Sequence, residues 1–481
     1  MTGIPTTRHY IDGAFVEPHS PARIAVVNPA TEEPVAEVAA GDDVDVDRAV
    51  AAARRAFPAF AATRPAERVA LLRRIADVFE ARRDELASAV TTEMGSPPWL
   101  AREMQTGSSI VYFRSAADVL ERFAFDEPRG ETLVTHEPIG VAALITPWNW
   151  PLNQIVTKLG PALAAGCTVV LKPSELSPLS ALLLAEVLDE AGVPPGVFNL
   201  VNGTGPTVGA ALSAHPDVDM VSFTGSTRAG IAIARAAADT VKRVHQELGG
   251  KSANVVLPDA DLDLAVTDGV RRCFINSGQS CIAPTRMLVH RDQLDEVLAR
   301  ATAVAAAVVV GDPTRPETTM GPVAGAAQFA KIQGMIETGI AEGARLVVGG
   351  PGRPEGLNRG FYVRPTIFAD VTPAMTIARE EIFGPVLSVM TYADEDEAVA
   401  IANDSLYGLA GYVHSRDLAH ARAVARRIRA GRIFLNDPFF DFEAPFGGYK
   451  RSGNGRELGV HGLMEFLEVK AILGYDRGAG A

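Results

Sequence analysis

Cys281 is the residue in this sequence best suited to nucleophilic chemistry. It lies in the segment NSGQSCIAPTR (276–286), between an expected helix and an expected strand, where a loop can expose a thiol. The thiolate of such a cysteine is a strong nucleophile. The other two cysteines, Cys167 and Cys273, open a strand and lie in a helical pattern, as small buried residues do. Three cysteines are too few for a disulfide framework and favour a reducing compartment.

Two polar residues could assist this thiol. Glu247 ends the apolar segment VKRVHQEL (241–248), where poor solvation would raise the proton affinity of its carboxylate and suit a general base. Asn149 lies between two tryptophans in TPWNWP (146–151), and an amide donor in an apolar wall suits an oxyanion hole. Each has a structural alternative: an ion pair of Glu247 with Lys251, or a turn in which Asn149 bonds its own backbone. The nine histidines show no close pair typical of zinc, so no metal is expected.

A phosphate-binding turn is indicated in VSFTGSTRAG (221–230). Gly225 would open the turn, and Ser226 and Thr227 could cap the helix that follows. The glycine spacing differs from the usual dinucleotide motif, so an ordinary capped helix is the alternative.

A second candidate for cofactor contact is LKPSE (171–175). Lys172 and Glu175 follow an expected strand, at the end where ligands collect in open α/β sheets. They could contact ribose hydroxyls or simply begin a helix.

Short apolar strands alternate with helices along the chain, which is typical of βαβ units and a parallel sheet. In the first such region, strands are expected at 140–146, 167–172, 198–201, 220–224 and 241–248, with helices at 152–165, 178–192, 207–214 and 226–238. The alternation restarts with strands at 253–257 and 286–290 and helices at 262–276 and 294–310. The strand-like segment 464–475 must pair within the chain or with a partner.

Seven segments together resemble the aldehyde dehydrogenase superfamily over nearly the whole chain. They are TPWNWP, GPALAAGCTVVLKPSE, FTGSTRAG, QELGGKSAN, GQSCIA, EEIFGPV and PFGGYKRSGNGRELG. The resemblance implies an α/β fold with a Rossmann-type cofactor domain, an α/β catalytic domain and a small β bridging element that mediates oligomerisation. The expected ranges are 1–118 and 139–248 for the NAD-binding domain, 249–448 for the catalytic domain, and 119–138 with 460–481 for the bridging element. A homodimer or homotetramer is implied.

The resemblance also implies a reaction and its residues. An aldehyde is oxidised to a carboxylic acid with NAD(P)+ and water through a thioester on Cys281. Asn149 and the Cys281 backbone N–H would form the oxyanion hole, Glu247 would activate the water, and Lys158 would lie behind this base. Two alternatives stay open: a CoA-acylating dehydrogenase, which would not need Glu247, and a catalytically silent binding or structural homologue, which would not need these residues intact.

The implied cofactor is NAD, because Glu175 should repel the 2′-phosphate of NADP, although Lys172 could tolerate it. The implied cofactor contacts are Ile145, Thr146, Pro147, Trp148, Lys172, Pro173, Ser174, Glu175, Gly205, Pro206, Phe223, Thr224, Gly225, Ser226, Leu248, Gly249, Gln328, Glu381 and Phe383.

A substrate pocket is expected near an aromatic segment, DPFFDFEAPF (437–446). Its expected members are Trp150, Asn153, Thr157, Ser280, Ile282, Phe439, Phe440 and Phe446. Aromatic walls suit an apolar or aromatic aldehyde, whereas Asp441 and Glu443 could favour a cationic aldehyde or simply face solvent. No arginine stands beside Cys281 in the sequence, so semialdehydes are less expected.

Bulk properties restrict the partners further. The 481 residues, 47% of them hydrophobic and 21% charged, indicate a globular chain of two to four domains. A formal net charge of −13 disfavours nucleic-acid binding. The longest aliphatic run, 303–310, is too short to span a membrane, and the N-terminus does not resemble a signal peptide. These properties predict a cytoplasmic protein, and the resemblance implies that its partner is a small-molecule aldehyde.

Overall fold

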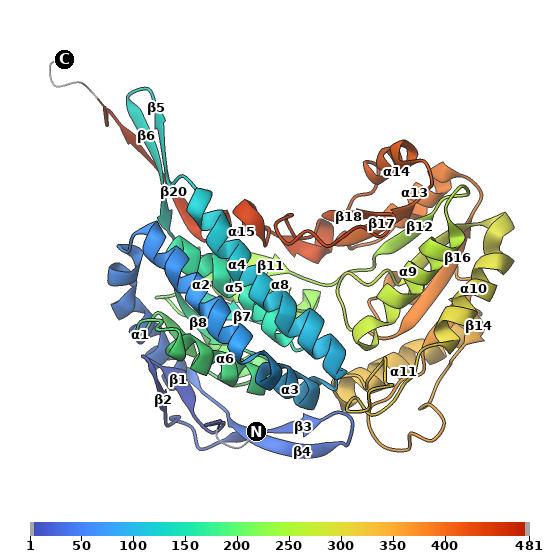
Figure 1. Cartoon of the computed structure of the whole chain (residues 1–481), viewed down its shortest axis with the longest axis horizontal. Helices are drawn as coiled ribbons and strands as arrows, with labels where there is room; N and C mark the ends of the chain where they lie inside the picture. The colour runs from blue at the N-terminus through green and yellow to red at the C-terminus, as the bar shows by residue number, and fades with distance from the viewer. Residues whose placement is uncertain (1–3, 477–481) are drawn as a thin grey trace.

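The computed structural model describes residues 4–476, which form two α/β lobes and a projecting β arm (Figure 1). The first lobe is built on an eight-stranded sheet in the order β19-β11-β10-β7-β8-β9-β1-β2. Its strands are β1 (His9–Ile11), β2 (Ala14–Val16), β7 (Val141–Ile145), β8 (Thr168–Lys172), β9 (Phe198–Leu200), β10 (Met220–Thr224), β11 (Arg243–Glu247) and β19 (Gly453–Asn454). The strands from β11 to β9 are all parallel, as the alternating sequence predicts.

Helices cover both faces of this sheet, so its central strands are apolar throughout. In β7, Ala142 and Leu144 pack into one core, while Val141, Ala143 and Ile145 pack into the core on the opposite face. The helices of this lobe are α1 (Asp43–Ala61), α2 (Pro65–Ala81), α3 (Arg83–Met94), the π-helix η1 (Leu100–Thr106), α4 (Gly107–Arg122), α5 (Pro151–Ala165), α6 (Leu179–Glu190), the π-helix η2 (Gly205–Gly209), α7 (Ala210–Ala214), α8 (Thr227–Ala237), η3 (Ala238–Thr240) and α15 (Gly459–Glu465).

The carboxyl ends of four parallel strands lie in register along one edge of the first sheet. Ile145 of β7 pairs with Lys172 of β8 and with Phe223 of β10, and Thr224 pairs with Glu247 of β11. The chain leaves β7 toward β8 and β9 on one side and returns to β10 and β11 on the other. Such a switch in strand order is where open α/β sheets bind ligands.

The second lobe repeats this plan with a seven-stranded sheet in the order β14-β15-β16-β13-β12-β17-β18. Its strands are β12 (Ala253–Val256), β13 (Arg286–His290), β14 (Arg345–Val348), β15 (Thr366–Ala369), β16 (Val386–Tyr392), β17 (Ala410–His414) and β18 (Arg432–Leu435). Its helices are α9 (Leu262–Phe274), η4 (Ile275–Gly278), η5 (Arg291–Gln293), α10 (Leu294–Ala306), α11 (Ala326–Ala341), α12 (Thr376–Arg379), α13 (Glu395–Asn403) and α14 (Leu418–Ala425), and the short η6 (Lys450–Ser452) leads back to the first sheet.

The arm is a three-stranded sheet that projects from the first lobe (Figure 1). Its strands are β5 (Asp126–Arg129), β6 (Thr132–Pro138) and β20 (Leu467–Leu473), and β20 pairs antiparallel with the whole of β6. The C-terminal strand thus finds its partner within its own chain. A separate hairpin of β3 (Arg23–Asn28) and β4 (Glu33–Ala39) lies near the N-terminus.

Four expected helices differ by two or more residues at one end. The helix expected at 178–192 ends at Glu190. The helix expected at 207–214 starts two residues earlier, as the π-turn η2. The helices expected at 262–276 and 294–310 end at Phe274 and Ala306. Within residues 4–476, no helix is long and apolar enough to cross a membrane.

Candidate functional site

The loop that carries Cys281 has an unusual backbone. After α9 ends, three successive residues, Asn276, Ser277 and Gly278, have φ angles of 53°, 56° and 72°. This left-handed conformation is strained for residues with a side chain and is found mainly where the surrounding structure enforces it. A Cβ atom at Gly278 would overlap the backbone of Gly384, so this close approach requires glycine. The loop ends at Cys281, which is half-buried, whereas Cys167 and Cys273 are buried as expected.

Asn149 lies against this loop. The turn between β7 and α5 carries it, and its Nδ2 donates to the carbonyl of Gln279 at 3.0 Å. In return, Asn276 Nδ2 donates to the carbonyl of Asn149 at 2.8 Å. The neighbouring Trp150 Nε1 donates to Ser280 Oγ at 2.8 Å. The amide of Asn149 therefore bonds the cysteine loop of the other lobe rather than its own turn.

Glu247 reaches the same place from the end of β11. Its side chain is buried, and neither carboxylate oxygen has a hydrogen-bond partner among the described residues. A Cβ atom at Gly447 would lie 2.8 Å from Oε1, so the chain passes close to this carboxylate. The alternative ion pair with Lys251 is not formed, since the Lys251 ammonium also has no partner within residues 4–476. Glu247 is therefore free to take part in chemistry.

Burial dominates the electrostatics of the acid and the thiol. It raises the pKa of Glu247 well above its ordinary value, and the charge of Glu457 raises it further. Burial also raises the pKa of Cys281, and the negative charges of Glu247 and Glu381 add to this effect. The thiol and these carboxylates therefore influence one another electrostatically.

Lys158 lies behind this base, in α5, and is completely buried. It forms an ion pair with Glu457, and the Lys158 charge lowers the pKa of Glu247. The sequence alone predicts no role for Glu457. The only available signal was its place in the segment PFGGYKRSGNGRELG, because its partners come from distant parts of the chain.

The aligned strand ends offer a cradle for a dinucleotide. Ser226 caps α8, and its Oγ accepts from the backbone N–H of Ala229 at 3.3 Å. A Cβ atom at Gly225 would lie 2.5 Å from the ring of Phe223, so the turn needs a glycine. The hydroxyls of Thr146 and Thr224 are buried at this edge and have no partner among the described residues. Unpartnered polar groups and a helix N-terminus fit a pyrophosphate-bearing cofactor.

Other expected cofactor contacts lie along the same edge. Lys172 Nζ donates to Glu175 Oε2 at 2.9 Å, and burial lowers the pKa of this lysine. Pro173 and Ser174 form the turn between them, and the Ser174 hydroxyl accepts from the backbone N–H of Leu176 at 3.2 Å. Gly205 and Pro206 are exposed at the start of η2, which follows β9.

A loop from the second lobe closes the other end of this cradle. Glu381 Oε1 accepts from the backbone N–H of Gly250 at 2.8 Å, beside Gly249 and Leu248. Phe383 has a left-handed φ of 61°, and its ring meets that of Trp148 edge-on, with centroids 5.5 Å apart. Trp148 is preceded by Pro147 after the end of β7.

Gln328, in α11, forms hydrogen bonds with the loop that carries Glu381 and Phe383. Its Nε2 donates to the carbonyls of Ile382 at 3.1 Å and Phe383 at 2.7 Å. In this structure its amide therefore holds the backbone of the loop.

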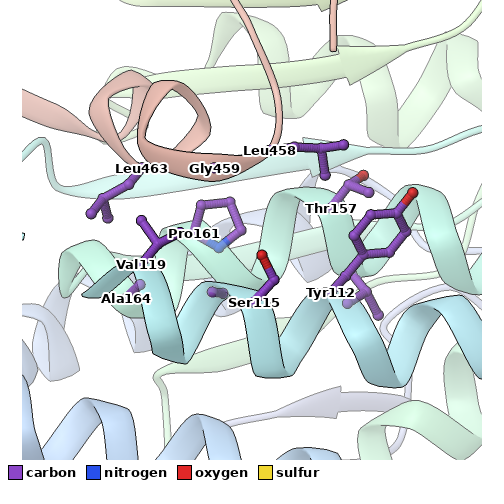
Figure 2. A pocket seen from close by; sticks show the side chains of 11 residues that line it. Tyr112, Ser115, Val119, Thr157, Pro161, Ala164, Leu458, Gly459 and Leu463 are labelled. Atoms are coloured by element: carbon purple, nitrogen blue, oxygen red, sulfur yellow. The ribbon is translucent and has the colours of Figure 1, made fainter. Parts of the chain in front are cut away.

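Aromatic residues lie next to the cysteine loop, where the hydroxyl of Tyr412 donates to the carbonyl of Ile282 at 3.0 Å. Phe440 packs against the cluster of Ala410, Tyr412 and Phe434, and Phe446 lies under the guanidinium of Arg432. Thr157 and Tyr112 line a small pocket between α4, α5 and α15 (Figure 2). Tyr112 also meets the ring of Phe442, with centroids 5.4 Å apart, so this pocket adjoins the aromatic wall.

Two expected pocket residues are placed elsewhere. Phe439 is fully exposed and makes no ring contact among the described residues, because the loop after β18 turns it outward. Asn153 uses its side chain to join α5 to α4, accepting from Ser109 Oγ at 3.0 Å and donating to Ser108 Oγ at 2.6 Å.

The two acids of the aromatic segment are engaged in local contacts. Glu443 pairs with Arg122. Asp441 Oδ1 accepts from the backbone N–H groups of Glu443 at 2.9 Å and Ala444 at 3.1 Å. These contacts leave the rings, rather than the acids, as the wall of the pocket.

Comparison with known proteins agrees with this arrangement. The family profile described as "Aldehyde dehydrogenase family" matches residues 15–472. A 3-succinoylsemialdehyde-pyridine dehydrogenase from Pseudomonas sp is 56% identical, over 97% of this chain and 98% of its own.

Solved structures are equally similar. A mutant of aldehyde dehydrogenase C from Pseudomonas syringae, in complex with NAD+ and octanal, is 58% identical with a TM-score of 0.98, and covers 98% of each chain. An NAD+ complex of aldehyde dehydrogenase from Bacillus cereus is 40% identical with a TM-score of 0.94, covering 97% of this chain and 96% of its own. This chain therefore belongs to the aldehyde dehydrogenase family, the NAD(P)-dependent oxidoreductases that oxidise aldehydes through a cysteine thioester.

Proposed function

We propose that this enzyme releases its product by hydrolysis, with Cys281 as the nucleophile and Glu247 as the base that activates water. Asn149 and the backbone N–H of Cys281 form the oxyanion hole. The observation that carries the proposal is the buried, unpartnered carboxylate of Glu247 beside the cysteine loop. A group in that state has a raised proton affinity and no competing protein donor.

The first half of the reaction builds a thioester. The Cys281 thiol gives up its proton to solvent water and its sulfur adds to the aldehyde carbon, and the resulting oxyanion accepts hydrogen bonds from Asn149 and the Cys281 N–H. NAD+, when bound, accepts hydride from that carbon. The loop carrying Glu381 and Phe383 holds the edge where this cofactor would lie, and Gln328 fixes that loop. The product of this half is an acyl thioester on Cys281.

The second half removes the acyl group. Glu247 accepts a proton from water, the hydroxide oxygen bonds to the acyl carbon, and the sulfur of Cys281 leaves with the electron pair. The neighbouring Lys158–Glu457 pair tunes the pKa of Glu247. Attack by a CoA thiol would not require this carboxylate, which favours water as the acceptor.

An assay with hexanal, NAD+ and optional CoA tests this proposal. We expect one carboxylate per NADH and no acyl-CoA by mass spectrometry. Cys281→Ala should abolish turnover while cofactor binding, measured by calorimetry, persists. Stoichiometric acyl-CoA, or near-normal turnover by the alanine variant, would refute the scheme.

NAD is the proposed physiological cofactor, with NADP a weaker alternative. Glu175 lies beside Lys172 at the end of β8, and its negative charge opposes a 2′-phosphate. Turnover compared at equal concentrations of the two cofactors checks this preference.

We propose aldehydes with an apolar portion as substrates, because rings dominate the wall near Cys281. The relatives support this in their names: one is a 3-succinoylsemialdehyde-pyridine dehydrogenase, and another was crystallised with octanal.

We also propose the domain ranges, the oligomeric state and the location of this enzyme. Residues 1–118 and 139–248 would form the NAD-binding domain and 249–448 the catalytic domain, with the arm as the bridging element. The exposed edge of β20 supports a homodimer or homotetramer. A cytoplasmic location agrees with three free cysteines, one of them in the site.

A further inference from the structure

Arg432 is an arginine that the tertiary structure brings to the aromatic wall. It is the first residue of β18, the edge strand of the second sheet, and pairs with Ala410 of β17. The centre of its guanidinium lies 4.8 Å from the ring centroid of Phe440 and 5.3 Å from that of Phe446. Two rings thus hold the cation in place.

The guanidinium of Arg432 is largely unsatisfied. Its Nη2 donates to the carbonyl of Ala444, but Nε and Nη1 are buried and have no partner among residues 4–476. Asp441, the acid in the adjoining loop, forms no ion pair with it, since Asp441 Oδ1 accepts from backbone N–H groups. A buried cation with unused N–H groups is costly unless an acceptor is supplied.

A second arginine nearby shows the contrast. Arg272 lies over the rings of Tyr412 and Phe434, at 5.8 and 5.7 Å, in the same kind of stacking. Its charge is paired with both Asp268 and Asp437. The protein therefore neutralises one ring-stacked arginine and leaves the other available.

Contacts connect the surroundings of Arg432 to the cysteine loop. The positive charge of Arg432 lowers the pKa of Glu247, so the two groups lie within electrostatic range. The charge of Arg432 lowers the pKa of the Tyr112 and Tyr412 hydroxyls, whereas that of Cys281 raises it. Phe440, which stacks on Arg432, packs against the cluster of Ala410, Tyr412 and Phe434. The hydroxyl of Tyr412 in turn donates to the carbonyl of Ile282, the residue after Cys281, at 3.0 Å.

We propose that Arg432 recognises a hydrogen-bond-accepting oxygen, a carboxylate or a ketone, on the chain of the aldehyde substrate. This inference rests on the proposed function, because it places that chain along the aromatic wall while its aldehyde carbon meets Cys281. The rings of Phe440 and Phe446 would pack on the apolar part, and the free N–H groups would bind the oxygen. A buried donor that awaits an acceptor discriminates strongly against substrates that lack one.

The competing explanation is that Arg432 only tunes Glu247. Loss of the Arg432 charge would then raise the pKa of the Glu247 carboxyl. The oxidation of every aldehyde would slow by the same factor, and the pH dependence of turnover would shift. A specificity role instead changes the ratio between substrates of equal length. This ratio is independent of the fraction of folded enzyme, so it separates the two explanations even if a variant is less stable.

The test compares kcat/KM for matched aldehydes in the full-length enzyme with NAD+. Succinic semialdehyde is paired with butanal and adipic semialdehyde with hexanal, while levulinaldehyde is paired with pentanal for the ketone. In Arg432→Met, we expect the preference for at least one acceptor-bearing member to fall about 10- to 100-fold relative to its partner. Arg432→Lys should retain part of that preference. Arg272→Met is the matched control, and its ratios should stay within about twofold of wild type, because the charge of Arg272 is already paired with Asp268 and Asp437.

The outcomes are distinct. A fall in the kcat/KM ratio of the semialdehydes to their partners identifies a carboxylate as the ligand. A fall in the ratio of levulinaldehyde to pentanal identifies a ketone. Unchanged ratios in Arg432→Met, or equal losses for both members of every pair, would overturn the inference while leaving hydrolytic oxidation intact. If the wild type oxidises none of these aldehydes, the proposed function itself fails and the inference fails with it.

Discussion

At the scale of single residues, the environment of Glu247 makes an ordinary carboxylate into a candidate base. The strand pattern already predicts a poorly solvated acid at this position. The structure adds that both oxygens lack partners among the described residues and that the pKa is raised by burial and by Glu457. A protonated Glu247 cannot accept a proton from water. Thioester hydrolysis should therefore accelerate as pH rises above the ordinary carboxyl range.

Glu247→Gln should separate the two halves of the reaction. We expect stopped-flow absorbance to show a burst of about one NADH per active site, because the thioester still forms. Steady turnover should then fall about 10²- to 10⁴-fold, and its rise with pH should disappear, because no base remains to activate water. Glu443→Gln, which removes an exposed carboxylate paired with Arg122, is the control and should behave as wild type. Normal steady turnover in Glu247→Gln would assign water activation to another group.

At the scale of elements, the loop from α9 to β13 delivers the thiol through three left-handed residues. The sequence predicts a loop here, because glycine, serine and asparagine follow the helical pattern. It does not predict the close packing of Gly278 on Gly384, which belongs to the loop of Glu381 and Phe383. This contact couples the position of Cys281 to the cofactor edge.

Gly278→Ala should disturb that coupling. The new side chain would be strained at a φ of 72° and would overlap Gly384. We expect a loss of about 1–3 kcal/mol in the free energy of unfolding and a loss of turnover. Gly334→Ala, in the interior of α11 with open space around its Cβ position, should instead gain about 0.5–1 kcal/mol. Thermal unfolding and NADH assays of both variants check the contrast, and equal stability of the two would contradict it.

At the scale of the whole molecule, the arm presents an apolar edge that the described chain leaves uncovered. Val469 and Leu473 of β20 are 62% and 79% exposed, and β20 is an edge strand. Exposed edges of this kind pair with further strands. Figure 1 shows the arm standing clear of the two lobes, where a second copy could reach it.

The double substitution Val469→Arg and Leu473→Arg should weaken the proposed assembly. Light scattering after size-exclusion chromatography should give a dimer or tetramer for the wild type and a smaller species for this variant, because charges are costly to bury in an interface. Val241→Arg, at a position 90% exposed in the first lobe, should leave the mass unchanged. A monomeric wild type would remove the basis for the proposed assembly.

The sequence alone predicted the alternating strands and helices between residues 140 and 310, and it singled out Cys281, Glu247 and Asn149 as candidates. Periodic apolar runs and local turn residues carry that information without knowledge of distant contacts. The same is true of the parallel sheets, because βαβ alternation permits few other arrangements. The sequence did not predict the strands and helices of the second lobe that follow residue 310. The structure confirms the strands expected between 140 and 290 to within about two residues at their ends. The strand-like segment expected at 464–475 is a strand only at Leu467–Leu473, because its first residues belong to α15.

Only the tertiary structure decided which side chains face the reacting centre. Glu457 meets Lys158, and Arg432 reaches the aromatic wall, from segments remote in sequence from Cys281. Phe439 is turned outward although its neighbour Phe440 is packed inward. No local pattern records such contacts, because they depend on how two sheets and a returning C-terminal segment pack together. The absence of an arginine beside Cys281 in the sequence therefore did not exclude an arginine at the aromatic wall.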